Sequence, residues 1–304
     1  RTGGARLHGV PEDHRDVFTF STLLVAGRRS LRWEWAARVL DEMSHREVIP
    51  NTVTYNTAIA VCGGHWEWSL HFLREMRRRR LSPDVLTLNT AVDACGKGGR
   101  WEKAIELLEQ TADSRIAPNV VTYSALVSAL NAGQRPRESW LLIQEMRRRA
   151  VLPNAVTYNA AISSCEHGHE WELALGMLAE MPLEAVRPTL VTFNSAITTC
   201  STAGQWICSL VLLEEARAGS LEPDLISYNS ALGSARDGGA WQRAVGLLHE
   251  MRLQRLEPDL VSYSFLVSTC QNAGRWELAL LCLEELRAGA SRPGPAVSGA
   301  AASA

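Results

Sequence analysis

Prolines recur along this sequence at a constant interval of 35 residues, from Pro83 to Pro293, and Pro50 lies 33 residues before Pro83. Self-similarity at a fixed period of this length is typical of proteins built from stacked structural repeats. The period therefore restricts the chain to a repeat architecture. In the fourth repeat Pro136 stands in the place of a tryptophan. In the other repeats tryptophans follow the same lattice, at Trp33, Trp66, Trp101, Trp171, Trp206, Trp241 and Trp276.

The lattice divides most of the chain into repeats of about one period each. Residues 1–16 read as the degenerate end of a preceding repeat, and we expect the Ala-, Gly-, Ser- and Pro-rich residues 295–304 to be a disordered tail. Because the chain begins with Arg1, we expect a mature protein or a fragment. The eight repeats are 17–51, 52–84, 85–119, 120–154, 155–189, 190–224, 225–259 and 260–294.

Each repeat contains two amphipathic helical patterns. Apolar residues recur at i, i+3, i+4 and i+7 in segments such as Tyr55–Cys62 and Trp101–Leu108. A Gly-rich turn such as Lys97–Arg100 separates the two patterns, and the proline disfavours helix before it. One hairpin cannot bury both apolar stripes, but stacked hairpins can. We therefore predict an all-α fold, a right-handed α-solenoid of about eight 35-residue helical hairpins with a concave groove.

The composition excludes several classes of protein. A formal net charge of −2 argues against a globally basic nucleic-acid binder, although a local field can still be positive. The sequence contains no run of 18 apolar residues, so it predicts no membrane-spanning helix. The seven cysteines form no C-x-x-C pair, and Cys62, Cys95, Cys165, Cys200 and Cys270 share one place in the repeat. We interpret these five as small buried residues in a protein from a reducing compartment.

No catalytic or metal-binding motif stands out. The segment Cys165–His169 places a cysteine and two histidines in one turn but lacks the wider ligand spacing of a zinc site. The nucleophile-elbow, phosphate-loop and H-E-x-x-H patterns are absent. We therefore expect no metal, no cofactor and no enzyme activity. The arginine runs 77–80 and 147–149 lie where second helices end, which favours a solvated face.

The residues around the repeat boundaries carry a family resemblance. Segments such as Val120–Ser124, Asp224–Asn229 and Glu145–Arg149, with most repeats closing in Pro-Asp or Pro-Asn, resemble the pentatricopeptide repeat over residues 17–294. The resemblance is to arrays without an added catalytic domain. It implies binding of single-stranded RNA, one base per repeat. In this family the fifth and last residues of a repeat contact the base edge, and the second residue sandwiches the base.

The resemblance implies the following site residues. The fifth residues are Ser21, Asn56, Asn89, Ser124, Asn159, Asn194, Asn229 and Ser264. The last residues are Asn51, Asp84, Asn119, Asn154, Thr189, Asp224, Asp259 and Gly294, of which Gly294 offers no side chain. The second residues are Phe18, Val53, Leu86, Val121, Val156, Val191, Ile226 and Val261.

The family's pairing rules imply a target. Asn with Asp resembles a uracil reader, Asn with Asn prefers a pyrimidine, and Ser with Asn prefers adenine. The implied RNA is 5′-A-U-Y-A-Y-U-U-3′, where Y is a pyrimidine and the fifth base is the least determined. The resemblance also implies a mitochondrial or plastid protein that acts as a monomer in RNA processing, stability or translation, with protein partners supplying any catalysis.

Three alternatives stay open on the sequence alone. The last residues precede helices, so N-capping by itself would select Asp, Asn and Thr there. Helical solenoids also serve as protein-binding scaffolds, although a peptide binder has no reason to keep Asn or Ser at every fifth position. A third alternative is a partial product that binds nothing tightly.

Overall fold

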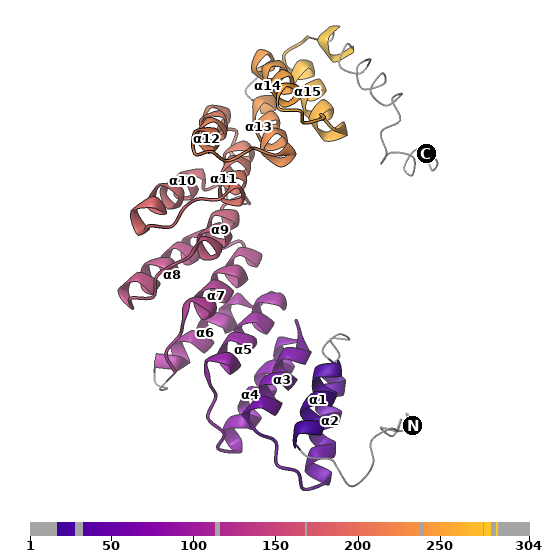
Figure 1. Cartoon of the computed structure of the whole chain (residues 1–304), viewed down its shortest axis with the longest axis vertical. Helices are drawn as coiled ribbons and strands as arrows, with labels where there is room; N and C mark the ends of the chain where they lie inside the picture. The colour runs from indigo at the N-terminus through magenta and orange to yellow at the C-terminus, as the bar shows by residue number, and fades with distance from the viewer. Residues whose placement is uncertain are drawn as a thin grey trace. The chain divides into compact units, whose positions relative to one another are not determined.

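The computed structural model describes residues 17–27, 33–112, 116–167, 169–237, 240–275, 277–280 and 284. The expected N-terminal repeat end, Trp276, Gly294 and the expected tail lie outside this part of the chain. All of the regular structure in the described residues is helical, which confirms the all-α class (Figure 1). None of these helices is long and apolar enough to cross a membrane.

The helices alternate between the first and second members of successive hairpins. The first helices are α1 (Val17–Gly27), α3 (Thr52–Cys62), α5 (Val85–Lys97), α7 (Val120–Ala132), α9 (Ala155–Ser164), α11 (Leu190–Thr202), α13 (Leu225–Asp237) and α15 (Leu260–Asn272). The second helices are α2 (Trp33–His45), α4 (Trp66–Arg78), α6 (Trp101–Ala112), α8 (Pro136–Arg148), α10 (Trp171–Glu180), α12 (Trp206–Ala218) and α14 (Trp241–Leu253), and a short 3-10 turn, η3 (Pro182–Glu184), follows α10.

The chain divides between Ser164 and Cys165 into two compact parts. In the first part α1, α3, α5, α7 and α9 pack against one another in chain order, and each of α2, α4, α6 and α8 packs on the first helix of its own hairpin and on that of the next. In the second part α11, α13 and α15 pack in the same way, with α12 and α14 beside them. Each part is thus a stack of helical hairpins, which is the α-solenoid architecture.

The predicted apolar stripes form the core of these stacks. Tyr55, Ala58, Ile59 and Cys62 on α3 are fully buried, as the spacing predicted. In the second helix of the following repeat, Ala104 and Leu108 are buried while Trp101 and Ile105 are half-buried.

The five aligned cysteines are all free and fully buried, which confirms their interpretation as small core residues. Burial raises the pKa of the Cys62 thiol to about 12, an increase that a weaker effect from Ser69 opposes. Burial also raises the pKa of Cys95 to about 11. These thiols therefore stay protonated at neutral pH, and a protonated thiol is a poor nucleophile and metal ligand.

The tryptophans at the starts of second helices pack between consecutive hairpins. The ring of Trp66 in α4 lies against Gly98, where α5 ends, and the ring of Trp101 lies against Gly133, where α7 ends. Arginines that precede the next hairpin's second helix lie over these rings, with Arg100 at 5.4 Å from Trp66 and Arg135 at 4.8 Å from Trp101. The tryptophan lattice is therefore explained by packing between hairpins.

Candidate nucleic-acid interface

The second residues of the repeats form a recurring apolar feature on the surface of the first helices. All eight are exposed, from 46% at Val261 to 77% at Phe18. A single exposed valine needs no explanation, because apolar atoms contribute much of any protein surface. Recurrence at the same place in every repeat is different, because each of these side chains could have been polar at no cost to the core. The pattern indicates a contact surface that repeats along the first helices.

The fifth residues lie on the same faces of the same helices. A fifth residue follows the second residue by three positions, so the two are neighbours on the helix surface. Asn89, Ser124, Asn194 and Asn229 are half-buried, while Ser264 is exposed. Asn56 is more enclosed than the others, with only 6% of its surface exposed. Polar amide and hydroxyl groups thus accompany the apolar second residues along the interface.

The last residues with described side chains are all N-caps of the next repeat's first helix. The side chain of Asp84 accepts from the backbone N–H of Thr87 over 2.7 Å, and the backbone N–H of Asp84 donates to Oγ1 of Thr87 over 3.1 Å, which completes a capping box. The last residues therefore do serve as N-caps, which is the structural role that the capping alternative gave them. Equivalent side-chain caps are made by Asn51, Asn119, Asn154, Thr189, Asp224 and Asp259.

The cap is not the last residue's only hydrogen bond in the Asn–Asp repeats, because the fifth residue also donates to it. The amide Nδ2 of Asn56 donates to Oδ1 of Asp84 over 3.2 Å. The same bond joins Asn194 to Asp224 over 3.2 Å and Asn229 to Asp259 over 3.2 Å. The fifth and last residues of these three repeats are therefore in direct contact, as recognition of one base by both would require.

A third side chain, which the sequence analysis missed, fixes the orientation of the fifth residue. The hydroxyl of Thr87, third residue of the next repeat, donates to Oδ1 of Asn56 over 2.5 Å and approaches Oδ1 of Asp84 at 2.8 Å. Ser227 and Ser262 donate to the carbonyl oxygens of Asn194 and Asn229 over 2.5 Å and 2.6 Å. A hydroxyl on one side and a carboxylate on the other leave the asparagine amide one orientation, with its carbonyl toward the hydroxyl.

The Asn–Asn repeat shows how the arrangement depends on the last residue. Thr122 donates to Oδ1 of Asn89 over 2.6 Å, as in the other repeats. Among the described residues, however, no bond from Nδ2 of Asn89 to Asn119 accompanies it. Asn119 serves instead as the cap of α7 through Thr122. The Asn89 amide therefore keeps its donors available toward solvent, whereas the Asn56 amide shares one donor with a carboxylate.

The serine repeats use the same partner through a shorter side chain. The hydroxyls of Ser124 and Thr157 lie 2.8 Å apart, and those of Ser21 and Thr54 lie 3.4 Å apart. Ser21 also donates to the backbone carbonyl of Val17 over 2.8 Å. The hydroxyl of Ser264 donates to the carbonyl of Val261 over 2.8 Å. In the fifth repeat Asn159 belongs to the first compact part and Thr189 to the second.

The three aspartates of the Asn–Asp pairs are held ionised. Partial burial alone would raise the pKa of Asp84, but hydrogen bonds from the backbone and hydroxyl of Thr87 and from Asn56 outweigh it, so the pKa falls below the usual 3.8. The same balance lowers the pKa of Asp224 and Asp259 through Ser227 with Asn194 and Ser262 with Asn229. At neutral pH these carboxylates only accept hydrogen bonds, so each places an acceptor beside an asparagine donor.

The other sequence candidates lie away from this face or do not assemble. Arg148 and Arg149 are exposed and both pair with Glu145 within their own helix segment, as expected of a solvated face. In the described residues no group of three potential metal ligands comes together, and Cys165 is fully buried.

The third residues could have been found from the sequence. All of them are Thr or Ser, at Thr19, Thr54, Thr87, Thr122, Thr157, Thr192, Ser227 and Ser262. The capping box alone accounts for a hydroxyl at this position, so the sequence gives no separate sign of the bond to the fifth residue. Only the contact to the preceding repeat, over 31 to 33 residues of chain, reveals that role.

Solved structures similar to this chain support the solenoid fold. The pentatricopeptide repeat protein PPR10 from maize matches with a TM-score of 0.62 at 23% identity, covering 91% of this chain and 45% of that one. PPR10 in complex with an 18-nt psaJ RNA element matches with a TM-score of 0.56 at 19% identity, covering 90% of this chain and 50% of that one. The chain thus spans about half the length of these proteins. No curated protein sequence matches it.

Family profiles match most of the chain. The pentatricopeptide repeat domain profile matches residues 14–65, 141–202 and 211–273. The PPR repeat family profile matches residues 83–132, and the PPR repeat profile matches residues 121–151. These matches agree with the constant period, the hairpin stacks and the capped first helices, and the chain belongs to the pentatricopeptide repeat family.

Proposed function

We propose that the chain binds single-stranded RNA sequence-selectively, with one base at each repeat. The observation that carries the proposal is the recurring group on the first helices. In each such group an exposed apolar second residue lies one helical turn from a fifth residue, and the fifth residue is oriented by its neighbours. Flat apolar contact on a base face and directed hydrogen bonds to its edge are the two interactions that single-stranded bases offer.

The Asn–Asp pairs suit uracil. The base-pairing edge of uracil presents an N–H donor between two carbonyl acceptors. The ionised carboxylate of Asp84 can only accept, and the amide of Asn56 can donate, so the two side chains complement that edge. The same argument applies to Asn194 with Asp224 and to Asn229 with Asp259. The implied target remains 5′-A-U-Y-A-Y-U-U-3′.

The biological role that fits this activity is organellar RNA processing, stability or translation, in a mitochondrion or plastid. A protein that covers a short stretch of RNA can block nucleases or deliver the RNA to other factors. On this proposal the chain works as a monomer without catalysis of its own, and protein partners supply any chemistry. PPR10, the maize protein that resembles this chain, was solved with an 18-nt RNA element.

The test is binding of the chain to 5′-AUCACUU-3′ against a scrambled RNA of the same composition, at about 50 and 200 mM salt. Preferential binding of the ordered RNA is the expected result. Equal binding of both RNAs that fades with salt would reduce the activity to attraction for the phosphate backbone. No binding at low salt would favour the protein-binding scaffold.

A matched pair of variants within one repeat locates the binding face. Val121 on α7 is 60% exposed and Leu141 on α8 is 63% exposed, so both can be truncated at similar small cost to the core. Val121→Ala should weaken binding of the ordered RNA, because it removes one side of the contact to a base. Leu141→Ala, on the second helix of the same repeat, should leave binding unchanged. The reverse result would place RNA on the second helices.

A further inference from the structure

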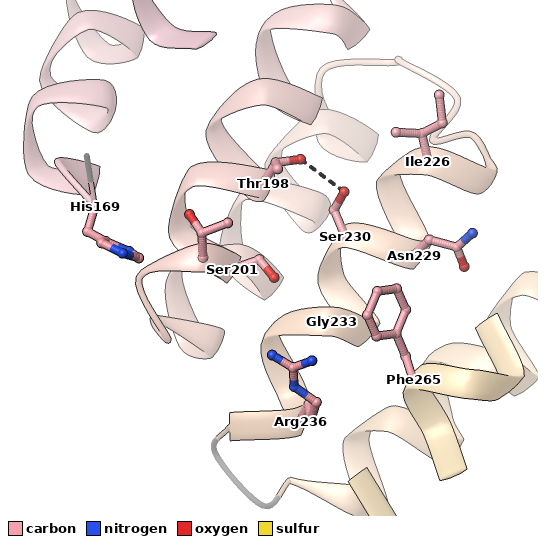
Figure 2. A pocket seen from close by; sticks show the side chains of 10 residues that line it. His169, Thr198, Ser201, Ile226, Asn229, Ser230, Gly233, Arg236 and Phe265 are labelled. Carbon is pink, nitrogen blue, oxygen red and sulfur yellow. Dashed lines mark hydrogen bonds between the residues drawn. The ribbon is translucent and has the colours of Figure 1, made fainter. Parts of the chain in front are cut away.

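A pocket of about 540 Å³ opens on the first helices of the second compact part, between α11, α13 and α15 (Figure 2). It is lined by Ile226 and Asn229, the second and fifth residues of the seventh repeat, and therefore continues the proposed base site. Thr198 on α11 and Ser230 on α13 join two of the walls through hydroxyls 3.0 Å apart. Its volume lies within the range of small-molecule and cofactor sites.

Two residues unusual for their repeat positions create the pocket. Phe265 is the sixth residue of the eighth repeat, and every other repeat has Thr, Ser or Ala there. Gly233 is the ninth residue of the seventh repeat, and every other repeat has a residue with a side chain at that position. A Cβ on Gly233 would lie 3.2 Å from Oγ of Ser201 and 3.5 Å from the ring of Phe265, so any larger residue would fill the space beside the ring. Figure 2 shows the Phe265 ring between Asn229 and Arg236.

The ring of Phe265 extends the apolar wall of the seventh base site. Phe265 follows Val261, the second residue of the eighth repeat, by four positions, so the two lie on one face of α15. A base that packs between Ile226 and Val261 would therefore have the aromatic ring beside it. Both apolar residues are exposed, Ile226 by 61% and Val261 by 46%.

The charge of the pocket suits a nucleotide. Arg236 lines it and is exposed, and its backbone carbonyl accepts from Nδ2 of Asn272 over 3.2 Å, which ties the end of α13 to the end of α15. The exposed His169 contributes a second nitrogen-bearing side chain. No carboxylate belongs to the described lining, although the whole chain carries a net charge of −2. A phosphate beside this wall would therefore meet the cation of Arg236.

We propose that this pocket holds the seventh nucleotide of the bound RNA by aromatic stacking, with the ring of Phe265 against its base and the guanidinium of Arg236 toward its phosphate. The inference rests on the proposed RNA binding and adds to it an anchor at one end of the site. Apart from Phe18 in the first repeat, the other second residues are aliphatic. At the seventh base an aromatic ring takes part, which makes this contact stronger and less dependent on the identity of the base.

The experiment is a double-mutant cycle between the protein and the RNA. Binding of wild type and Phe265→Ala is measured with 5′-AUCACUU-3′ and with the same RNA carrying an abasic site at its seventh position. Loss of a stacked base contact corresponds to about 5- to 150-fold weaker binding. We expect Phe265→Ala to lose that much affinity for the complete RNA and less than about twofold for the abasic RNA, where no base remains to be stacked.

Two controls separate stacking from structure. Phe265→Tyr keeps the ring and should restore binding of the complete RNA to nearly the wild-type level. An abasic site at the second position, far along the RNA, should weaken wild type and Phe265→Ala equally. Unchanged affinity of Phe265→Ala for the RNA that is abasic at its seventh position also serves as evidence that the variant folds.

The remaining outcomes overturn one claim or the other. If wild type prefers the ordered RNA but Phe265→Ala binds the complete RNA as tightly, the stacking proposal is wrong and the proposed function stands. Equal losses on the complete RNA and on the RNA abasic at its seventh position would assign Phe265 a structural role and also refute stacking. If wild type binds neither RNA at low salt, the proposed function itself fails.

Discussion

The amide of Asn56 donates to the carboxylate of Asp84 across almost the whole length of one repeat, with Nδ2 and Oδ1 3.2 Å apart. The carboxylate that receives this bond also caps α5 through Thr87. One aspartate thus starts the next helix and orients the polar group of the preceding one. N-capping and base recognition are therefore compatible roles of the same side chain, and selection for either would keep Asp, Asn or Thr at this position.

The first prediction tests the capping role of Asp84. Asp84→Ala removes the cap and should destabilise the protein by about 0.5–2 kcal/mol, whereas Asp84→Asn keeps a capping oxygen, loses only the charge, and should destabilise the protein less. Because the Thr87 amide is bonded to the Asp84 side chain, hydrogen exchange at Thr87 should accelerate in the alanine variant alone. Urea unfolding and hydrogen exchange give the two readouts.

Asp93→Ala is the control for the loss of an exposed carboxylate. Asp93 pairs with Lys97 over 2.6 Å on the same helix and caps nothing, so its removal should change stability by less than about 0.5 kcal/mol. If Asp84→Ala proved as mild as Asp93→Ala, the capping box would contribute nothing measurable, and base contact alone would explain the aspartate.

The second prediction exchanges the specificity of two neighbouring repeats. Asn89→Ser should turn the third repeat from a pyrimidine reader into an adenine reader, and Ser124→Asn should do the reverse in the fourth. Both side chains already meet a threonine hydroxyl of the next repeat, at 2.6 Å for Asn89 with Thr122 and 2.8 Å for Ser124 with Thr157. The exchange therefore alters the group offered to the base while keeping its support.

The measurement is the affinity of each variant for RNAs that differ only at the third or the fourth base. A preferred base should be favoured by about 1–3 kcal/mol, or about 5- to 150-fold in affinity. The two single variants control for each other, because each should shift preference at its own base only. An unchanged preference at both bases would mean that the fifth residues do not read the RNA in this register.

Much of the fold follows from the sequence, and the reasons are local. The stripe from Tyr55 to Cys62 predicts a buried helix face because apolar spacing is a property of one segment. The capping role of Asp84 follows from its place before a helix. The bond from Thr87 to Asn56 could not be read in the same way, because the capping box already accounts for the threonine. Likewise, Phe265 and Gly233 come from different repeats, and only their packing reveals a pocket.

The third prediction concerns acid. The hydrogen bonds that lower the pKa of Asp84, Asp224 and Asp259 below 3.8 favour the ionised form in the folded protein. Their contribution to stability is therefore complete above the unfolded-state pKa, near 3.8, and is lost as the pH falls through the lower folded-state values. Unfolding by urea should become easier as the pH falls below about 4.

A variant with all three aspartates changed to asparagine should lose part of this dependence, because an amide does not titrate. The difference in stability between variant and wild type should be nearly constant from pH 7 to about 5 and should shrink below about 4. A difference that grew on acidification would give these carboxylates raised pKa values in the folded protein and contradict the hydrogen-bond assignment.

The last prediction tests the packing of tryptophan between hairpins with two glycines. A Cβ on Gly133 would lie 2.4 Å from Cδ1 of Trp101, whereas a Cβ on Gly246, inside α14, would meet nothing within 4 Å. The backbone of Gly133 has φ −84, so alanine fits the conformation and only the ring obstructs it. Gly133→Ala should therefore destabilise the protein by about 1–3 kcal/mol through overpacking.

Gly246→Ala is the control and should stabilise the protein by up to about 1 kcal/mol, because alanine is the better helix former. The guanidinium of Arg135 lies over the ring, 4.8 Å from its centroid, and helps to hold Trp101 in place. Thermal unfolding followed by circular dichroism should move the two midpoints in opposite directions. A neutral Gly133→Ala would show that Trp101 shifts freely and that the tryptophan lattice needs an explanation other than packing.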